Sequence, residues 1–257
     1  MQILKVFNSL YYKKIKNQIG SRHLKKWALR YSSANGLIDF IDKLNEKWDS
    51  AGVSFVDYCL LYYYIEKRKP QYFLELGTGK STHIIAKAMH DYCYEKYNGK
   101  IKLCSTETEE AWYQKAVANI PDEYKEFVEI YNLPFIPYSY LFIHGLCSEN
   151  LPDYPYDCCF VDRAATPGHG VNMDLMKVII NSDKPIDAIF DSQKKQVLAY
   201  LSVIDKQHFT FLPNGFTYLQ NVSAYDLPQE LSDYTIDKNI KQLFQKRLKF
   251  RWSPLYK

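Results

Sequence analysis

The chain has 257 residues, of which 47% are apolar, so it can build one large domain, alone or with helical extensions. No stretch approaches the ~18 consecutive apolar residues of a membrane span. The first residues lack the charged start, long apolar centre and small-residue cleavage site of a signal peptide. The six cysteines are scattered without a Cys-x-x-Cys pair, which disfavours a zinc site or a thioredoxin-like redox motif and predicts free buried thiols in a reducing cytoplasm.

Positive charge is concentrated at the two ends of the sequence. Residues 1–38 carry eight Lys or Arg and residues 238–257 carry seven, with no acidic residue in either segment. The part between them holds 18 basic and 29 acidic residues, a net charge of −11. The ends are either solvated faces of terminal helices or a surface for an anionic partner, such as a membrane, a phosphorylated substrate or nucleic acid. One hypothesis is that they fold together over the sheet and cap an acceptor site or contact a membrane peripherally.

The N-terminal part of the chain predicts helices. Residues 1–31 alternate apolar and basic groups with the spacing of one or two amphipathic helices, and Asn35-Gly36 ends that pattern. Residues 37–48 indicate another helix, and Ser54 is a favourable cap for a helix that runs to Glu66. We therefore expect three parts: a basic helical extension at 1–53, a central domain at 54–222, and a basic C-terminal segment at 223–257 with a helix at 238–250.

Residues 72–82 organise the central domain, because they combine an apolar strand, a turn with two glycines and the start of a helix. Glycine is needed where the chain turns sharply and where a ligand approaches the backbone closely. The helix after the turn directs its free N–H groups and the positive end of its dipole at the ligand, which favours a carboxylate or a phosphate. An ordinary strand-to-helix turn is the alternative, because Gly-x-Gly alone is a weak signal.

The alternation of strand and helix continues to residue 222. Continuous apolar strands separated by helices indicate a parallel sheet covered on both faces, which is the α/β class. Asn214-Gly215 between the last two strands is a strong hairpin signal. The expected strands are 72–76, 101–106, 127–131, 156–161, 186–190, 208–212 and 216–222, and the expected helices are 80–95, 112–119, 173–180 and 193–204.

Acidic side chains gather at the predicted carboxyl ends of the strands, where open parallel sheets bind their ligands. Four of the five strand ends carry an acid. Helix capping explains any one of these carboxylates, but it explains the set less well. The residues are Glu75, which opens the glycine stretch, and then Glu107, Asn132, Asp162 and Asp191.

Three segments in this order resemble motifs of the class I S-adenosylmethionine-dependent methyltransferases. Residues 74–82 (LELGTGKST) are similar to the family's glycine motif, residues 105–112 (STETEEAW) to its second motif, and residues 156–162 (YDCCFVD) to its fourth. The resemblance covers about residues 54–222. It implies a three-layer Rossmann-like sandwich, with a seven-stranded, mostly parallel sheet and one antiparallel strand. The helical extensions at both termini are predicted from the residue pattern of the two ends.

The resemblance implies S-adenosylmethionine as the cofactor. Gly77 and Gly79 would let the backbone approach its methionine part. The helix start at Ser81 and Thr82 would bind its carboxylate, and Glu107 would accept hydrogen bonds from both ribose hydroxyls. Position 82 is threonine where a dinucleotide fingerprint has its third glycine, which favours the methyl donor over NAD. The predicted cofactor-binding set is Glu75, Gly77, Thr78, Gly79, Ser81, Thr82, Glu107 and Asn132.

Asn132 opens a second, competing pattern. The run Asn132-Leu133-Pro134-Phe135 is similar to the Asn-x-Pro-Tyr/Phe signature of methyltransferases that act on amino groups of bases or glutamine. In those families the signature follows the fourth strand, whereas here it follows the third by count and the fourth ends in Asp162. We interpret Asn132 as an adenine-side loop residue and keep base or amide N-methylation as the alternative. The place of Asn132 in the sheet order decides between them.

Asp162 and Asp191 end strands that are neighbours in this fold, about 4.8 Å apart, so both carboxylates would face the cleft where the methyl group is delivered. They are the predicted catalytic residues, one as general base, together with His169 from a Pro-Gly-His-Gly loop. Alternatively, the two carboxylates bind a divalent ion such as Mg²⁺, which lowers the pKa of an acceptor hydroxyl. Methyltransferases of the catechol type have an Asn after the second carboxylate, whereas this chain has Ser192, so the third metal ligand is absent. Capping aspartates and a plain loop histidine are the structural alternatives.

The predicted function is O-methylation of a small molecule, a sugar, or a phosphorylated or glycan acceptor. One alternative is N-methylation of nucleic acid or of an amide, with the basic ends as the binding surface, and another is a non-catalytic scaffold with the cofactor fold. Acceptor specificity is expected in the loops 134–155 and 163–172. The predicted location is cytoplasmic with peripheral contact to an anionic membrane, and a homo-oligomer is left open.

Overall fold

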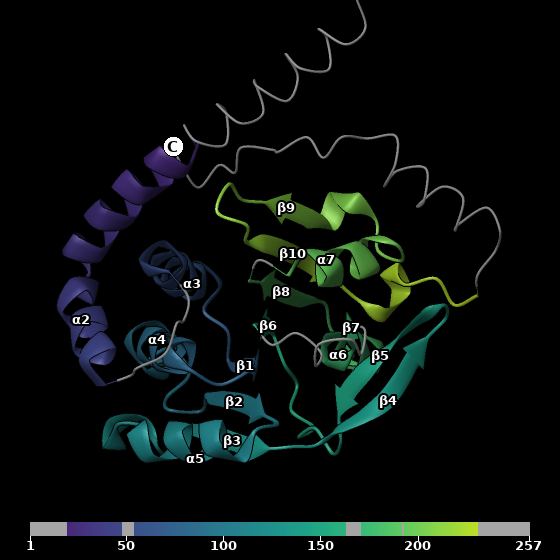
Figure 1. Cartoon of the computed structure of the whole chain (residues 1–257), viewed down its shortest axis with the longest axis horizontal. Coiled ribbons are helices and arrows are strands. Elements are labelled where there is room, and N and C mark those ends of the chain that lie inside the picture. Colours follow the sequence, from purple (N-terminus) through teal and green to yellow (C-terminus); the bar gives the residue numbers. More distant parts are fainter. Residues whose placement is uncertain (1–19, 48–53, 163–170, 192, 231–257) are drawn as a thin grey trace, which may run out of the picture.

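The centre of the protein is a seven-stranded sheet (Figure 1), in a computed structural model that describes residues 20–47, 54–162, 171–191 and 193–230. The strand order is β3-β2-β1-β6-β8-β10-β9. β10 runs antiparallel to both of its neighbours and all other pairs are parallel, so the predicted sheet with one antiparallel strand is confirmed. The strands are β1 (Tyr72–Leu76), β2 (Lys102–Glu107), β3 (Val128–Asn132), β6 (Cys158–Val161), β8 (Ile186–Phe190), β9 (Phe209–Phe211) and β10 (Thr217–Val222).

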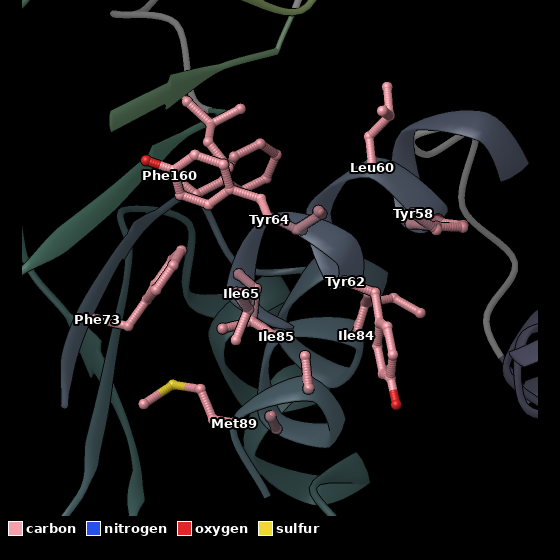
Figure 2. Close-up of a cluster of buried hydrophobic side chains, with 14 of the residues drawn as sticks. Tyr58, Leu60, Tyr62, Tyr64, Ile65, Phe73, Ile84, Ile85, Met89 and Phe160 are labelled. Atoms are coloured by element: carbon pink, nitrogen blue, oxygen red, sulfur yellow. The ribbon is translucent and has the colours of Figure 1, made fainter. Parts of the chain in front are cut away.

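Helices cover both faces of this sheet. Successive strand residues point to opposite faces, so Phe73 and Phe160 belong to one core while Leu74 and Val161 belong to the other. Figure 2 shows the first core, in which side chains of α3 and α4 lie beside Phe73 and Phe160. Because both faces are buried, the strands are continuous apolar runs. The helices are α2 (Leu37–Lys47), α3 (Phe55–Arg68), α4 (Lys80–Met89) and α5 (Glu110–Asn119), with α6 (Asp174–Asn181) and α7 (Lys194–Leu201) over the second core.

The helices predicted within the described ranges are present, with different ends. The helix expected at 80–95 consists of α4 and a π-helical turn at His90–Tyr94. Residues 20–34 are helical, whereas 1–19 and the helix expected at 238–250 lie outside the described residues. The hypothesis that the two basic ends join, and the proposed boundaries of the three parts, therefore stay predictions. No helix in the described ranges is long and apolar enough to cross a membrane.

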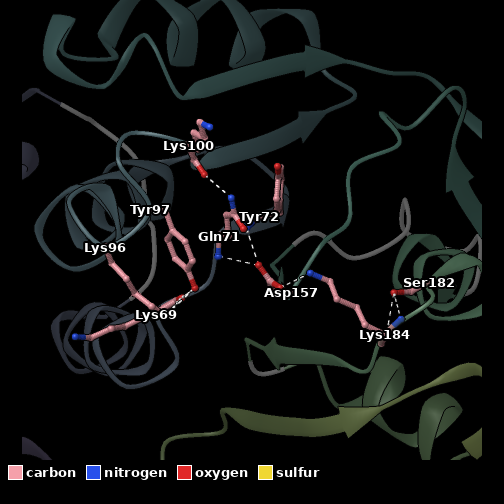
Figure 3. Close-up of polar contacts among 9 residues, drawn as sticks. All are labelled: Lys69, Gln71, Tyr72, Lys96, Tyr97, Lys100, Asp157, Ser182 and Lys184. Atoms are coloured by element: carbon pink, nitrogen blue, oxygen red, sulfur yellow. Dashed lines mark hydrogen bonds and ion pairs between the residues drawn. The ribbon is translucent and has the colours of Figure 1, made fainter.

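Asp157 links three neighbouring strands at their amino ends, which is the end of the sheet opposite the glycine turn (Figure 3). Its Oδ2 accepts hydrogen bonds from the backbone N–H groups of Gln71 and Tyr72, at 2.7 and 2.8 Å, and its Oδ1 pairs with Lys184. Asp157 precedes β6, Tyr72 begins β1 and Lys184 precedes β8. The register of these parallel strands is thereby fixed, and their carboxyl ends lie side by side.

A second sheet of three strands, β4-β5-β7, was not evident from the sequence, which predicts a loop over 134–155. Its strands are β4 (Phe135–Tyr140), β5 (Ile143–Ser148) and β7 (Val171–Asn172). Pro137 argues against a strand, but β4 lies at the edge of the sheet, where a missing N–H is tolerated. Gly145 lets β5 approach β7, because a Cβ there would lie 2.0 Å from the carbonyl oxygen of Val171.

Candidate active site

The turn between β1 and α4 is shaped by two glycines with different requirements. Gly77 has a φ of 106°, which L side chains rarely adopt, and its N–H donates to the carbonyl oxygen of Thr106 at 2.9 Å. Gly79 has an extended φ of 173°. A Cβ built on Gly79 would have one described neighbour within 4 Å, the Oγ of Ser81 at 3.9 Å. As far as the described residues go, the space on this side of Gly79 is therefore open.

Glu75 supports the turn from inside the protein. Its carboxylate is fully buried and accepts three hydrogen bonds of 2.6 Å, from the hydroxyls of Ser81, Thr82 and Ser105. Burial raises the pKa of Glu75 to about 7, although the three hydroxyls counteract the shift. The side chains of Glu75, Ser81 and Thr82 thus bind one another. Because these side chains are engaged with one another, any contact with a cofactor at this point would have to come from the backbone at the helix start.

Glu107 is the last residue of β2 and lies next to the glycine turn. Its Oε1 accepts hydrogen bonds from the backbone N–H groups of Thr108 and Glu109, at 2.6 and 3.1 Å, and its Oε2 accepts one from the hydroxyl of Thr78 at 3.4 Å. The carboxylate therefore caps the turn that follows it and also borders residues 77–79. The sequence places Glu107 at the ribose, and its position beside the turn is compatible with that prediction.

Asn132 lies at the end of β3, which is the edge strand of the sheet. It is level with Glu107 in the strand register, and its side-chain amide donates to Glu110. β1 lies between β2 and β6, and β6, which is the fourth strand of the main sheet along the chain, is followed by Asp162. The position that the amino-group methyltransferase signature requires is therefore held by an aspartate and not by Asn132.

Asp162 and Asp191 follow β6 and β8, which are hydrogen-bonded neighbours. Their backbone N–H groups continue the strand pairing, with Asp162 N to Leu76 O at 3.1 Å and Asp191 N to Val161 O at 3.1 Å. Burial, followed by the nearby carboxylate of Asp191, raises the pKa of Asp162 well above its usual range. The two carboxylates are close enough to share a hydrogen bond.

Solved methyltransferase structures are similar to this chain. The crystal structure described as "a putative caffeoyl-CoA O-methyltransferase from Staphylococcus aureus" has a TM-score of 0.52 and 15% identity, covering 77% of this chain and 98% of that one. A methyltransferase from Geobacter sulfurreducens has a TM-score of 0.48 and 14% identity, covering 72% and 89%. No protein-family model matches the sequence, and neither does any curated protein.

The chain has the fold of the class I S-adenosylmethionine-dependent methyltransferases. At 15% identity the likeness concerns the fold, so the chemistry has to be argued from the site itself. In this methyltransferase fold the glycine turn, Glu107 and Asp162 come from the adjacent strands β1, β2 and β6, and all lie at the carboxyl edge of the sheet. That edge is where such sheets bind ligands.

Three polar residues near the aspartate pair were not identified as site candidates from the sequence, namely Asp57, Tyr58 and Asn214. Tyr58 of α3 is 2% exposed, and its hydroxyl has no hydrogen-bond partner among the described residues. Burial raises the pKa of Tyr58, and the charges of Asp162, Asp57 and Asp191 raise it further, so the phenol lies within electrostatic range of these carboxylates. Asp57 also accepts a hydrogen bond of 2.5 Å from Asn214, which ties the β9–β10 turn to the start of α3. Tyr58 lies in an aromatic run and Asn214 in a hairpin turn, so neither carries a sequence signal for a site.

The metal-binding hypothesis finds no support in the described part of the chain. No group of three or more His, Cys, Asp or Glu side chains gathers there around a common point. Within those ranges, Asp162 and Asp191 form a pair that no third such ligand joins. His169 and Ser192, the other residues considered for the acceptor side, lie outside the described residues, so the role of His169 stays a prediction.

Proposed function

We propose that this protein is an S-adenosylmethionine-dependent methyltransferase that acts on a hydroxyl of a small molecule, a sugar, or a phosphorylated or glycan acceptor. The observation that carries the proposal is the convergence of three features at one edge of the sheet. These are the glycine turn after β1, Glu107 at the end of β2, and the Asp162–Asp191 pair after β6 and β8. The first two suit a cofactor, and the pair suits removal of a proton.

The open space at Gly79 supports a ligand at the turn. An extended backbone accepts any residue, and among the described residues a Cβ would touch only the hydroxyl of Ser81 at van der Waals distance, so the described part of the protein does not require glycine here. A ligand held against the backbone does require it, because a side chain would take its place. The backbone at residues 77–79 would hold the methionine part of the cofactor, and Glu107 would hold the ribose hydroxyls.

The aspartate pair supplies the base. S-adenosylmethionine, when bound, provides a methyl group on a sulfonium, a leaving group that needs no activation by the protein. Asp162, as an ionised carboxylate, would accept the proton of the acceptor hydroxyl as its oxygen takes the methyl group, while the sulfur–methyl bond of the cofactor would break and S-adenosylhomocysteine would leave. Burial, and then the charge of Asp191, raise the pKa of Asp162 well above its usual range, which makes its ionised carboxylate a stronger base. Asp162 follows the strand beside β1, so base and cofactor turn are adjacent.

The position of Asn132 favours oxygen over nitrogen as the acceptor atom. Base or amide N-methylation would use the Asn-x-Pro-Phe run beside β1, but this run follows the edge strand β3. A scaffold without activity is the remaining alternative. Calorimetry with S-adenosylmethionine separates it from the enzyme, because a chain that does not bind the cofactor cannot transfer its methyl group.

The state of the cysteines supports a cytoplasmic enzyme. All six are buried free thiols, and disulfides are rare where thiols are kept reduced. We include this location in the proposal, and cell fractionation checks it.

Replacement of Glu107 by alanine is expected to weaken S-adenosylmethionine binding by ~1–3 kcal/mol, because it removes a charged hydrogen-bond acceptor at the ribose. Isothermal titration calorimetry measures the change. Glu109→Ala is the matched control, since Glu109 is exposed and two residues away, and its affinity should equal that of the wild type. Equal affinities for both variants would remove Glu107 from the cofactor site.

Replacement of Tyr58 by phenylalanine is expected to keep or raise the melting temperature while lowering kcat/KM about tenfold. A buried hydroxyl without a protein partner costs stability, whereas a hydrogen bond made in the loaded site is worth about that factor in rate. Tyr64→Phe, on the same helix, is the control and should keep full activity. Full activity of Tyr58→Phe would show that the phenol takes no part in the reaction.

A further inference from the structure

The helix at residues 20–34, called helix 20–34 below, has one face inside the protein and one outside. Leu24 and Ala28 are buried, and the rings of Trp27 and Tyr31 each lie 5.4 Å from the ring of Tyr63 on α3, centroid to centroid. Figure 1 shows this helix, in purple, along the outer side of α3. Its apolar face is therefore already occupied by the protein's own core.

The outward face carries cations and no acid. Its charged positions recur at helical spacing around Leu29, whose side chain is 56% exposed. None of the four cations forms an ion pair with another residue in the described ranges. We call this surface the cationic face; it consists of Arg22, Lys25, Lys26, Leu29 and Arg30.

This arrangement is unfavourable for the helix by itself. Arg22 and Lys26 are four residues apart, as are Lys26 and Arg30, and like charges at that spacing repel each other on the helix surface. The nearest acidic residue in the sequence is Asp39, so no acid on the same helix offsets the repulsion. No contact within the described structure uses these charges. An anionic partner would relieve the repulsion and account for their grouping.

The shape and composition of the cationic face favour a lipid surface over nucleic acid. The face is the convex side of a single helix, with an exposed leucine at its centre, so cations surround one apolar side chain. Helices that lie on membranes combine these features, because Lys and Arg bind the headgroups while apolar side chains enter the acyl boundary. Binding of single-stranded nucleic acid uses exposed aromatic platforms, but the aromatic rings of this helix pack against α3.

We propose that the cationic face of helix 20–34 binds the surface of an anionic phospholipid bilayer, with Leu29 entering the acyl boundary. This binding would hold the enzyme beside an acceptor at the membrane surface without a membrane span. The proposal concerns the outer side of α3 and does not depend on methyl transfer, so the two can fail separately.

Cosedimentation of the full chain with vesicles tests the proposal. The wild type is expected to bind vesicles of phosphatidylcholine with phosphatidylglycerol, to ignore pure phosphatidylcholine, and to lose binding as salt is raised. Each Lys or Arg near an anionic surface is worth roughly a factor of five in affinity. The variant R22Q/K25Q/K26Q/R30Q should therefore bind on the order of several hundredfold more weakly at low salt. Leu29→Ser should lose several-fold in affinity and keep the salt dependence.

The control removes the same number of charges elsewhere. The variant K43Q/K100Q/K194Q/K195Q changes four exposed lysines on other elements and should bind as the wild type does. All positions changed are exposed, so circular dichroism should show unchanged melting for each variant. Equal loss in the two quadruple variants would mean that net charge, not the cationic face, drives binding. Binding to a labelled single-stranded RNA, with none to vesicles, would overturn the proposal in favour of nucleic acid.

Discussion

Replacement of Asp162 by asparagine is expected to lower kcat by about 10²–10⁴-fold, the usual contribution of a general base. The amide has nearly the same shape and cannot accept the proton of the acceptor hydroxyl. Binding of S-adenosylmethionine should stay close to the wild type, because the glycine turn and Glu107 belong to other strands. Turnover is measured with labelled cofactor, once an acceptor screen has found a substrate.

The control for this variant is the charge partner. Asp191→Asn keeps the base and removes the like charge that raises the pKa of Asp162, so the pKa of Asp162 should fall. The base must be ionised to act, so the wild-type kcat/KM should drop as pH falls through the raised pKa. In Asp191→Asn this drop should occur at lower pH. If the pH profile of kcat/KM in Asp191→Asn is the same as in the wild type, the pair does not take part in the mechanism. Near-wild-type turnover of Asp162→Asn would lead to the same conclusion.

The raised pKa also has a consequence for stability. A carboxyl whose pKa is higher in the folded state binds more protons there, so stability is lost as pH rises from the ordinary carboxyl range through the raised pKa. Asp162→Asn, which cannot ionise, should therefore melt at a higher temperature than the wild type in mildly alkaline buffer. A gain in stability together with a loss of turnover is expected for a residue that contributes to activity and lowers the stability of the folded protein.

The sequence predicts the main sheet well because each central strand is buried on both faces. β1, β6 and β8 are short apolar runs between turn signals, and glycine or an acid follows each of them at the edge where ligands bind. The order of these strands rests on the resemblance to the methyltransferases. The structure confirms it by placing β6 between β1 and β8.

Other parts of the site depend on tertiary contacts that leave no pattern in the sequence. Glu75 follows the family motif, but its burial under the turn depends on Ser105, which comes from a different strand. Tyr58 belongs to an apolar helix and becomes a site candidate only because the fold brings its hydroxyl within electrostatic range of Asp162. The β4–β5 hairpin could not be predicted because Pro137 argues against a strand in the sequence. A proline is acceptable in β4 because this strand lies at the edge of its sheet.

Replacement of Gly79 by alanine is expected to leave stability unchanged or to raise it by up to ~1 kcal/mol, because the backbone is extended and the unfolded chain becomes less flexible. Its affinity for S-adenosylmethionine should nevertheless fall by about 1–3 kcal/mol, roughly 5-fold to 160-fold, because the added methyl group occupies space that the ligand needs. For Gly77→Ala, we expect the main loss in folding stability. At a φ of 106° an alanine is strained, which should cost about 1–3 kcal/mol of folding stability.

The two variants together separate a ligand requirement from a folding requirement within one turn. Chemical denaturation gives the stability of each variant, and calorimetry gives its affinity for the cofactor. Gly79→Ala should lose affinity without losing stability, since a Cβ at this position meets only the Oγ of Ser81 at 3.9 Å. If Gly79→Ala instead binds the cofactor as tightly as the wild type, the open space at Gly79 does not hold the ligand. The glycine turn would then serve only the connection between β1 and α4.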